Sequence, residues 1–217
     1  MRHLLLASLA ALLPMLSPAA SPRFTDGPVA AWVGGGDTVD PSVQLGWHAG
    51  YDVVPSINLQ LGYSYHSDSI SARDLADLGL PVGSQVDLDL HTLSASSRWY
   101  AWTGDLTGVY GVAGVQFMLA NEDADEVNRA IVRQNSPIRD FSASVHKEFG
   151  FHAGFGIERS LTSNWETFLE YRHVWHEADV DYTLVTVDPQ GSRRGVETNG
   201  KLPYDYDALR LGINYRF

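Results

Sequence analysis

The chain has 217 residues, of which 44% are hydrophobic and 19% charged, which suits one folded domain and not a disordered or collagen-like chain. Its formal net charge of −11 argues against a groove for nucleic-acid backbones, and the absence of cysteine excludes a disulfide framework, a zinc knuckle and a thiol nucleophile. Beyond the first residues, no run of about 18 apolar residues occurs, so any membrane crossing would have to use β-strands.

The first twenty residues have the composition of a secretory signal peptide. Arg2 provides a basic start, residues 4–16 form a short apolar stretch, and small residues surround a cleavage region near Ala19. The apolar stretch is too short to serve as a membrane anchor. We therefore predict a signal peptide over residues 1–20 and a single exported domain over residues 21–217.

Eight segments of the exported part are predicted as β-strands, because apolar and polar residues alternate along them with a period of two. The alternation is weaker in residues 88–101, and the first segment is short and has no clear parity. In chain order the segments are residues 28–34, 43–52, 57–65, 88–101, 106–119, 144–158, 164–178 and 207–217.

The last segment shows the clearest alternation. Leu209, Leu211 and Ile213 share one face with the terminal aromatic residues, whereas Arg210 and Arg216 share the other face. An apolar face suits contact with lipid, and a polar face suits the interior of a barrel. The segment therefore has the pattern of a strand that closes a membrane barrel.

Short and long connections alternate between these segments. The short ones are tight turns at residues 53–56, 103–106 and 161–164. The long ones are polar and cover residues 35–42, 67–86, 120–143 and 179–203. This alternation is typical of short periplasmic turns and longer outer loops. We predict an all-β fold, an eight-stranded antiparallel up-and-down transmembrane β-barrel with both termini on the periplasmic side.

A lipocalin-like barrel is the alternative fold. Its strands also alternate apolar and polar residues, but the apolar side chains point inward around a ligand. Aromatic residues argue against it, because they cluster near the ends of the predicted strands, as the girdles of a membrane barrel require. These residues are Trp47, Tyr51, Tyr63, Tyr65, Trp99, Trp165, Trp175 and Tyr215.

Three stretches resemble a known family. Residues 149–175, "FGFHAGFGIERSLTSNWETFLEYRHVW", and residues 49–65, "AGYDVVPSINLQLGYSY", resemble hairpins of small outer-membrane barrels of the OmpA, OmpX and opacity-protein group, and "LGINYRF" resembles their closing strand. The resemblance implies an outer-membrane location and an assembly signal in Tyr215 and Phe217 that the outer-membrane assembly machinery reads. Residues 120–143 are more charged than the family pattern, and we expect no OmpA-type periplasmic domain after the barrel.

Charged residues of both signs occupy the alternate strand positions that are predicted to point into the barrel. An eight-stranded barrel is about wide enough for its side chains to fill, and buried charges must be paired. We therefore expect a plug of paired charges, with a gate or narrow ion path as the alternative. The residues are Arg98, Glu148, Glu158, Glu166, Glu170, Arg172, Arg210 and Arg216.

The turn at residues 160–164 also predicts which inward residues meet. If it sets the register, Glu148 lies near His176 and His152 lies near Arg172. Glycines on the earlier strand would then leave space in the lumen for larger side chains on the later one. The expected pairs are Gly150 with Val174, Gly154 with Glu170, and Gly156 with Phe168.

We expect no metal and no cofactor. Five histidines have lumen parity, but they occupy different heights on different strands and lack the spacing of a ligand set. They are His48, His66, His146, His152 and His176. The acidic residues 121–126, "NEDADE", lack the spaced ligands and turn glycine of a calcium loop, so a solvated loop is the simpler interpretation.

Basic residues near the third long connection could contact lipopolysaccharide phosphates, because guanidinium groups bind phosphate through two hydrogen bonds. The alternative is that they keep a loop soluble, and the sequence favours neither. They are Arg129, Arg133, Arg139 and Lys147, with Arg193, Arg194 and Lys201 on the last loop.

An enzyme acting on lipid A is a further alternative, but it has little support. His173 and Asp207 have outward parity on adjacent strands, yet no serine in a recognisable motif lies beside them as a nucleophile. We predict a monomeric, non-enzymatic outer-membrane barrel in contact with lipid and lipopolysaccharide, serving envelope integrity or surface interaction through its outer loops. A narrow porin is the second hypothesis.

Overall fold

A computed structural model of the chain describes residues 23–34, 41–71, 85–123, 128, 138–145, 148–187, 190 and 192–217. No helix among these residues is long and apolar enough to cross a membrane.

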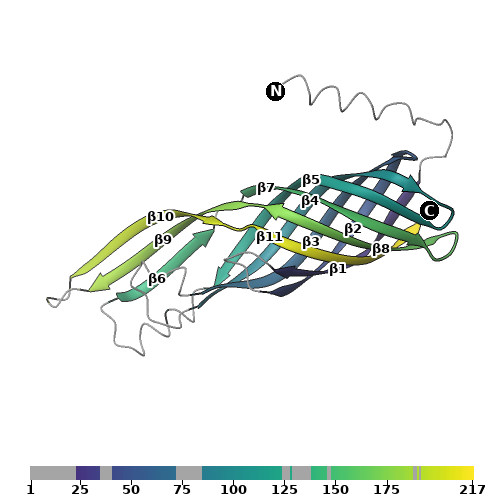
Figure 1. Cartoon of the computed structure of the whole chain (residues 1–217). Helices are drawn as coiled ribbons and strands as arrows, with labels where there is room; N and C mark the ends of the chain where they lie inside the picture. Colours follow the sequence, from purple (N-terminus) through teal and green to yellow (C-terminus); the bar gives the residue numbers. More distant parts are fainter. Residues whose placement is uncertain are drawn as a thin grey trace, which may run out of the picture.

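Eight strands close into an antiparallel barrel (Figure 1). They are β1 (Phe24–Gly34), β2 (Ser42–Val54), β3 (Ile57–Ser71), β4 (Gln85–Thr103), β5 (Thr107–Asp123), β7 (Glu148–Ser160), β8 (Trp165–Trp175) and β11 (Tyr206–Arg216). Their order around the barrel is β1, β11, β8, β7, β5, β4, β3, β2, so each strand pairs with the barrel strands that precede and follow it in the chain. The predicted eight-stranded antiparallel barrel is confirmed.

The tight turns lie at one end of the barrel, which we call the turn end. They join β2 to β3, β4 to β5 and β7 to β8, where the sequence predicts them. The two ends of the described chain also meet here, because the Phe217 N–H donates to the Phe24 carbonyl oxygen at 3.0 Å. This bond joins the last residue of the chain to the first residue of β1.

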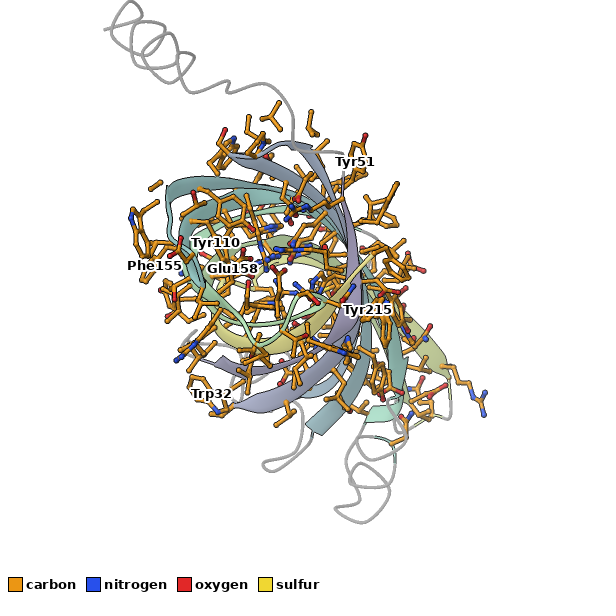
Figure 2. All side chains as sticks on the ribbon, turned by 90° about the vertical axis from the view of Figure 1, so that its right-hand side faces the viewer. Trp32, Tyr51, Tyr110, Phe155, Glu158 and Tyr215 are labelled. Carbon is orange, nitrogen blue, oxygen red and sulfur yellow. The ribbon has the colours of Figure 1, made fainter. Side chains whose placement is uncertain are left out.

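The outward face of the barrel is apolar, and polar residues point inward. Along β8, Leu169 is exposed and the adjacent Glu170 is fully buried. Figure 2 looks into the turn end and shows Tyr110 and Glu158 inside the ring of strands, with Phe155 outside it. The lipocalin-like alternative, which needs a polar outer face, is therefore wrong.

A second, three-stranded sheet extends beyond the opposite end of the barrel, which we call the sheet end (Figure 1). Its strands are β6 (Ile138–Val145), β9 (Glu177–Val187) and β10 (Arg193–Pro203), in the order β10, β9, β6. The sheet prolongs the barrel wall. Val174 of β8 pairs with Tyr206 of β11, and the same register continues into β9 and β10, where Glu177 pairs with Pro203.

The sheet corrects the prediction of long loops. Residues 179–203 are a β-hairpin for most of their length, β6 occupies part of residues 120–143, and β3 and β4 extend into residues 67–86. Predicted strand 144–158 is also divided, because β6 ends at residue 145 and β7 begins at residue 148. The polarity of these residues was interpreted as a loop, but residues 193–201 of β10 are exposed, and a strand with water on both faces can be polar throughout.

The predicted register of β7 and β8 is wrong by two residues. Gly154 lies opposite Arg172 and Gly156 lies opposite Glu170, whereas His152 lies opposite Val174. The cause is the turn, in which the N–H groups of Leu161 and Thr162 donate to the Trp165 carbonyl oxygen. This arrangement centres the hairpin one residue later than the sequence suggested.

Candidate functional site

The eight predicted lumen charges fall into separate groups in the barrel. Five of them gather at mid-height: Arg98, Glu158, Glu170, Arg172 and Arg210. Glu166 and Arg216 form a separate ion pair nearer the turn end. Glu148 is half-buried opposite Met118 near the sheet end, apart from both groups.

Glu170 is the centre of a buried cluster that we call the arginine hub, which consists of Glu170, Arg98, Arg172 and Arg210. Arg98 donates to Glu170 Oε2 from Nε at 3.1 Å and from Nη2 at 2.8 Å. On Oε1, Arg172 Nε and Arg210 Nη1 each donate at 2.5 Å. Tyr110 Oη also donates to Oε2 at 3.1 Å. Because one carboxylate accepts all these bonds, it links four strands, β4, β5, β8 and β11, through charged hydrogen bonds.

Aromatic rings and a second acid support Arg98 in the hub. Its guanidinium carbon lies 4.4 Å from the ring centre of Tyr110 and 4.6 Å from that of Phe168. Such cation–π contacts are strongest where water is excluded. Glu158 Oε2 lies 3.9 Å from Arg98 Nη1 and accepts a hydrogen bond from Tyr100 Oη at 2.8 Å. Arg98 is therefore fixed from several sides.

A polar cavity of about 340 Å³ lies between the hub and the turn end. Arg98 and Glu158 line its inner side, and turn residues such as Pro55 and Asp105 line its outer side. Other polar groups complete the wall: Thr25, Asp52, Asn58, Tyr100, Glu166, Asn214 and Arg216. This half of the lumen has the size and polarity to hold water or a small solute.

The other half of the lumen contains a buried apolar cluster, which we call the apolar plug, with the buried polar side chains of Gln44, His66, Asp68 and Gln116 among its members. Its members from the barrel and its rim are Ala31, Val33, Leu88, Leu90, Met118, Val174, Tyr204, Tyr206 and Ala208. Ile138, Phe141 and Val180 of the three-stranded sheet belong to the same cluster. The plug therefore joins the lumen to the sheet in one core.

Two titratable side chains lie where the plug meets the sheet, between the barrel strands and the sheet strands. The Tyr204 hydroxyl donates to Asp68, and burial together with that carboxylate raises the pKa of Tyr204. Burial lowers the pKa of His176, whose backbone N–H donates to Asp205 Oδ1 at 2.8 Å. Both side chains are therefore neutral near pH 7, which suits their place beside an apolar core.

The lumen histidines are dispersed. His152 Nε2 lies 2.9 Å from Ser96 Oγ and 3.2 Å from Arg172 Nη1, while His66 Nδ1 lies 3.4 Å from Gln44 Nε2. His48 instead packs edge-on against Phe168. Within the described ranges, no group of three or more His, Asp or Glu side chains has the arrangement of a metal site. His146 lies outside these ranges, as do residues 124–126 of the acidic stretch.

His173 and Asp207 do meet on the outer face of the barrel. Asp207 Oδ1 lies 2.8 Å from His173 Nδ1 and accepts a hydrogen bond from Tyr171 Oη at 2.6 Å. The residues paired with them across the strands are Ala153 beside His173 and Gly34 beside Asp207. These cross-strand neighbours provide no hydroxyl, so within the described part of the chain the arrangement is an acid–histidine pair without a serine paired to it.

The remaining predicted residues divide between described and undescribed parts of the chain. Arg129, Arg133 and Lys147 lie outside the described residues, and the side chain of Arg139 in β6 is also outside them. Tyr215 and Phe217 are at the turn end, where the Tyr215 ring lies 5.0 Å from Trp165 and 4.9 Å from Phe217. The aromatic end of the chain thus belongs to an aromatic cluster.

Sequence reasoning missed the residues that pack around the hub and fill the sheet end. Tyr110 has inward parity in β5, and its alternation with the outward Val109 was a usable signal. Leu88 and Leu90 also point inward, although their apolar character favoured an outward position. The weak alternation in residues 88–101 was the sequence signal that apolar side chains point inward in this segment.

Comparisons with known proteins agree with this architecture. The chain is 29% identical over 118 residues to a 22 kDa outer membrane protein of Rhizobium leguminosarum bv. viciae, an alignment that covers 54% of this chain and 48% of that protein. The chain therefore matches about half the length of this relative.

Solved structures with similar folds include OprG of Pseudomonas aeruginosa, with a TM-score of 0.66 at 15% identity over 93% of this chain and 98% of that one. A major outer membrane protein of Thermus thermophilus has a TM-score of 0.57 at 16% identity over 91% and 100% of the two chains. These likenesses concern the fold. The family profile described as outer membrane protein beta-barrel domain matches residues 5–217, and this chain accordingly belongs to that family of outer-membrane proteins.

Proposed function

We propose that this protein is a closed outer-membrane barrel that does not conduct ions and that presents its three-stranded sheet for interactions at the cell surface. The observation that carries the proposal is the apolar plug, which fills the sheet end of the lumen and is continuous with the sheet. An ion would have to cross both this plug and the arginine hub, and neither offers it a hydrated path.

The orientation follows from the two ends of the barrel. Short turns at one end and long strands at the other are typical of barrels whose turns face the periplasm. The turn end then faces the periplasm, and the sheet stands outside the membrane. On β10 the side chains of residues 193–201 are exposed, and this strand forms one edge of the sheet. An edge strand offers backbone donors and acceptors to a partner.

Lipopolysaccharide and the outer-membrane assembly machinery are the partners we propose. Arg129, Arg133, Arg139 and Lys147 lie in or beside β6 in the sequence, and Arg193, Arg194 and Lys201 are exposed on β10. Guanidinium and ammonium groups on the sheet suit lipid phosphates. The exposed aromatic end of the chain at Phe217 is suited to recognition during assembly.

Planar-bilayer recording tests the closed lumen. Folded protein, identified by its altered mobility on unheated gels, should insert without producing stable conductance steps. Stable steps that are weakened by Glu170→Gln or Arg210→Gln would overturn the proposal and support a narrow porin instead.

Unchanged lipid A mass spectra after overexpression would agree with a non-enzymatic role, whereas a new lipid A species lost in His173→Ala would contradict it.

Removal of the sheet hairpin tests its role at the surface. Glu177 and Pro203 are paired, so an Asn-Gly turn can replace residues 178–202 with little change in the register of the strands below. Cells that display this variant should lose binding to host-matrix or abiotic surfaces, while cells that display Thr198→Ala should keep it. Equal binding by both variants would show that the hairpin is not the interaction surface.

A further inference from the structure

The cavity at the turn end is not used by the proposed function. Its volume of about 340 Å³ is within the range of small-molecule sites, and it opens between the turns at residues 55–56 and 104–106. Its inner side is closed by the Arg98 side of the arginine hub. A solute entering from the turn end would therefore reach a polar pocket and stop there.

Two buried amide oxygens in the cavity wall lack a protein partner. The side chains of Asn58 and Asn214 are 3% and 2% exposed, and no group among the described residues donates a hydrogen bond to the Oδ1 atom of either. The orientation of Asn58 is fixed, because its Nδ2 donates to Asp52 Oδ1 at 2.7 Å. Buried acceptors of this kind are costly unless a donor reaches them, so the cavity is suited to a ligand rich in N–H or O–H groups.

The charges in the cavity wall favour a cation. Three arginines line it, Arg23, Arg98 and Arg216, against four acids, Asp52, Asp105, Glu158 and Glu166, so the formal sum is +3 − 4 = −1. Two of the arginines are already occupied. Arg216 is paired with Glu166, and Arg98 lies between Glu170 at 2.8 Å and Glu158 at 3.9 Å. Among the described residues no cationic side chain is paired with Asp52, which lies beside Asn58, so Asp52 provides the uncompensated negative charge at this part of the cavity wall.

We propose that the turn-end cavity binds a small organic cation with an ammonium group. An ammonium group carries three donors and no acceptor, which matches the unpaired oxygens of Asn58 and Asn214. Asp52 balances its charge, and Glu158 adds negative charge on the inner side of the cavity. This proposal is independent of whether the barrel conducts, because the ligand enters and leaves by the turn end.

Three probes of similar size separate the chemistry of the ligand: ethanolamine carries an ammonium, ethylene glycol is neutral, and glycolate is an anion. The side-chain amide signals of Asn58 and Asn214 are followed by NMR in detergent micelles of the full protein at pH 7. Ethanolamine should shift both signals saturably, and the other two probes should not. Equal shifts with ethylene glycol would indicate a hydrated cavity without charge preference, and a preference for glycolate would indicate an anion site; either result overturns the proposal.

Glu158→Gln tests the charge requirement, because it keeps an acceptor for Tyr100 and removes the negative charge. Loss of a charged hydrogen-bond partner should weaken ethanolamine binding by about tenfold. Glu177→Gln, on the exposed sheet, is the matched control and should bind as the unmodified protein does. If Glu158→Gln does not fold, Asp52→Asn serves in its place. Unchanged affinity in a folded cavity variant would contradict the proposal.

Discussion

The two halves of the lumen are filled in opposite ways, although the lipid-facing surface is apolar around both. The turn-end half has charged and amide side chains around a cavity of about 340 Å³, whereas the sheet-end half is packed with side chains such as Val33 and Leu90, both fully buried. The arginine hub lies between them. The difference teaches that lipid dictates the outward face of such a barrel, while the inward face can form either a polar cavity or a packed, mainly apolar core.

The apolar plug also explains the position of the three-stranded sheet. Phe141 and Val180 of the sheet and Leu90 of the barrel belong to one cluster, so the sheet is anchored by packing as well as by the strands that continue into it. The polar half has no such continuation, because its strands end in tight turns. Changes in the two halves should therefore have different consequences.

Glu170→Gln in the polar half should have the largest effect. It leaves three buried guanidinium groups without their shared counter-ion, and loss of one partner from a buried pair costs about 3–5 kcal/mol. The free energy of unfolding in lipid vesicles, measured by denaturant titration, should fall by that amount. Arg210→Gln should cost less, because Glu170 keeps two arginines. If the two variants lose the same stability, Glu170 is not the centre of the cluster.

Leu90→Ala tests the apolar half. The side chain is fully buried in the plug, so its truncation loses transfer free energy and leaves a cavity, together about 2–5 kcal/mol. Leu93→Ala on the same strand is the matched control, because Leu93 faces outward and lipid can fill the space left there. The same unfolding titration should show the smaller loss for Leu93→Ala. Equal losses would mean that the sheet end is loosely packed or hydrated.

The sequence predicts the barrel well because lipid imposes a strict requirement on alternate residues. The inward parity of Glu170 and Arg210 follows from the same requirement. Their partners do not follow, because an error of two residues in the β7–β8 register changes which glycine faces Glu170. The alternation along a strand determines whether a side chain points inward or outward, and the turn determines which residue of the neighbouring strand lies opposite it.

The plug and the sheet lie beyond prediction for a different reason. Leu88 and Leu90 are apolar and inward, so they contradict the pattern that identifies lipid-facing residues. In β9, Val180, Tyr182 and Leu184 alternate with acidic and hydroxyl residues and pack on the plug, so a period of two was present in the sequence but lay within a segment that was interpreted as a loop. In β10, residues 193–201 are exposed, no apolar surroundings select one face, and no such period is present.

Asn128→Ala should have the smallest effect, and a local one. Asn128 Oδ1 accepts from the Phe141 N–H at 2.9 Å, and its Nδ2 donates to the Phe141 carbonyl at 3.0 Å. The side chain thus satisfies the edge of β6 where Phe141 enters the plug. Its loss should cost about 1 kcal/mol locally and speed amide exchange at Phe141 about fivefold, with global unfolding unchanged. Ser142→Ala, on the exposed face of β6, should leave this exchange rate unchanged. Faster exchange throughout the barrel in Asn128→Ala would instead show that the sheet and the barrel unfold as one unit.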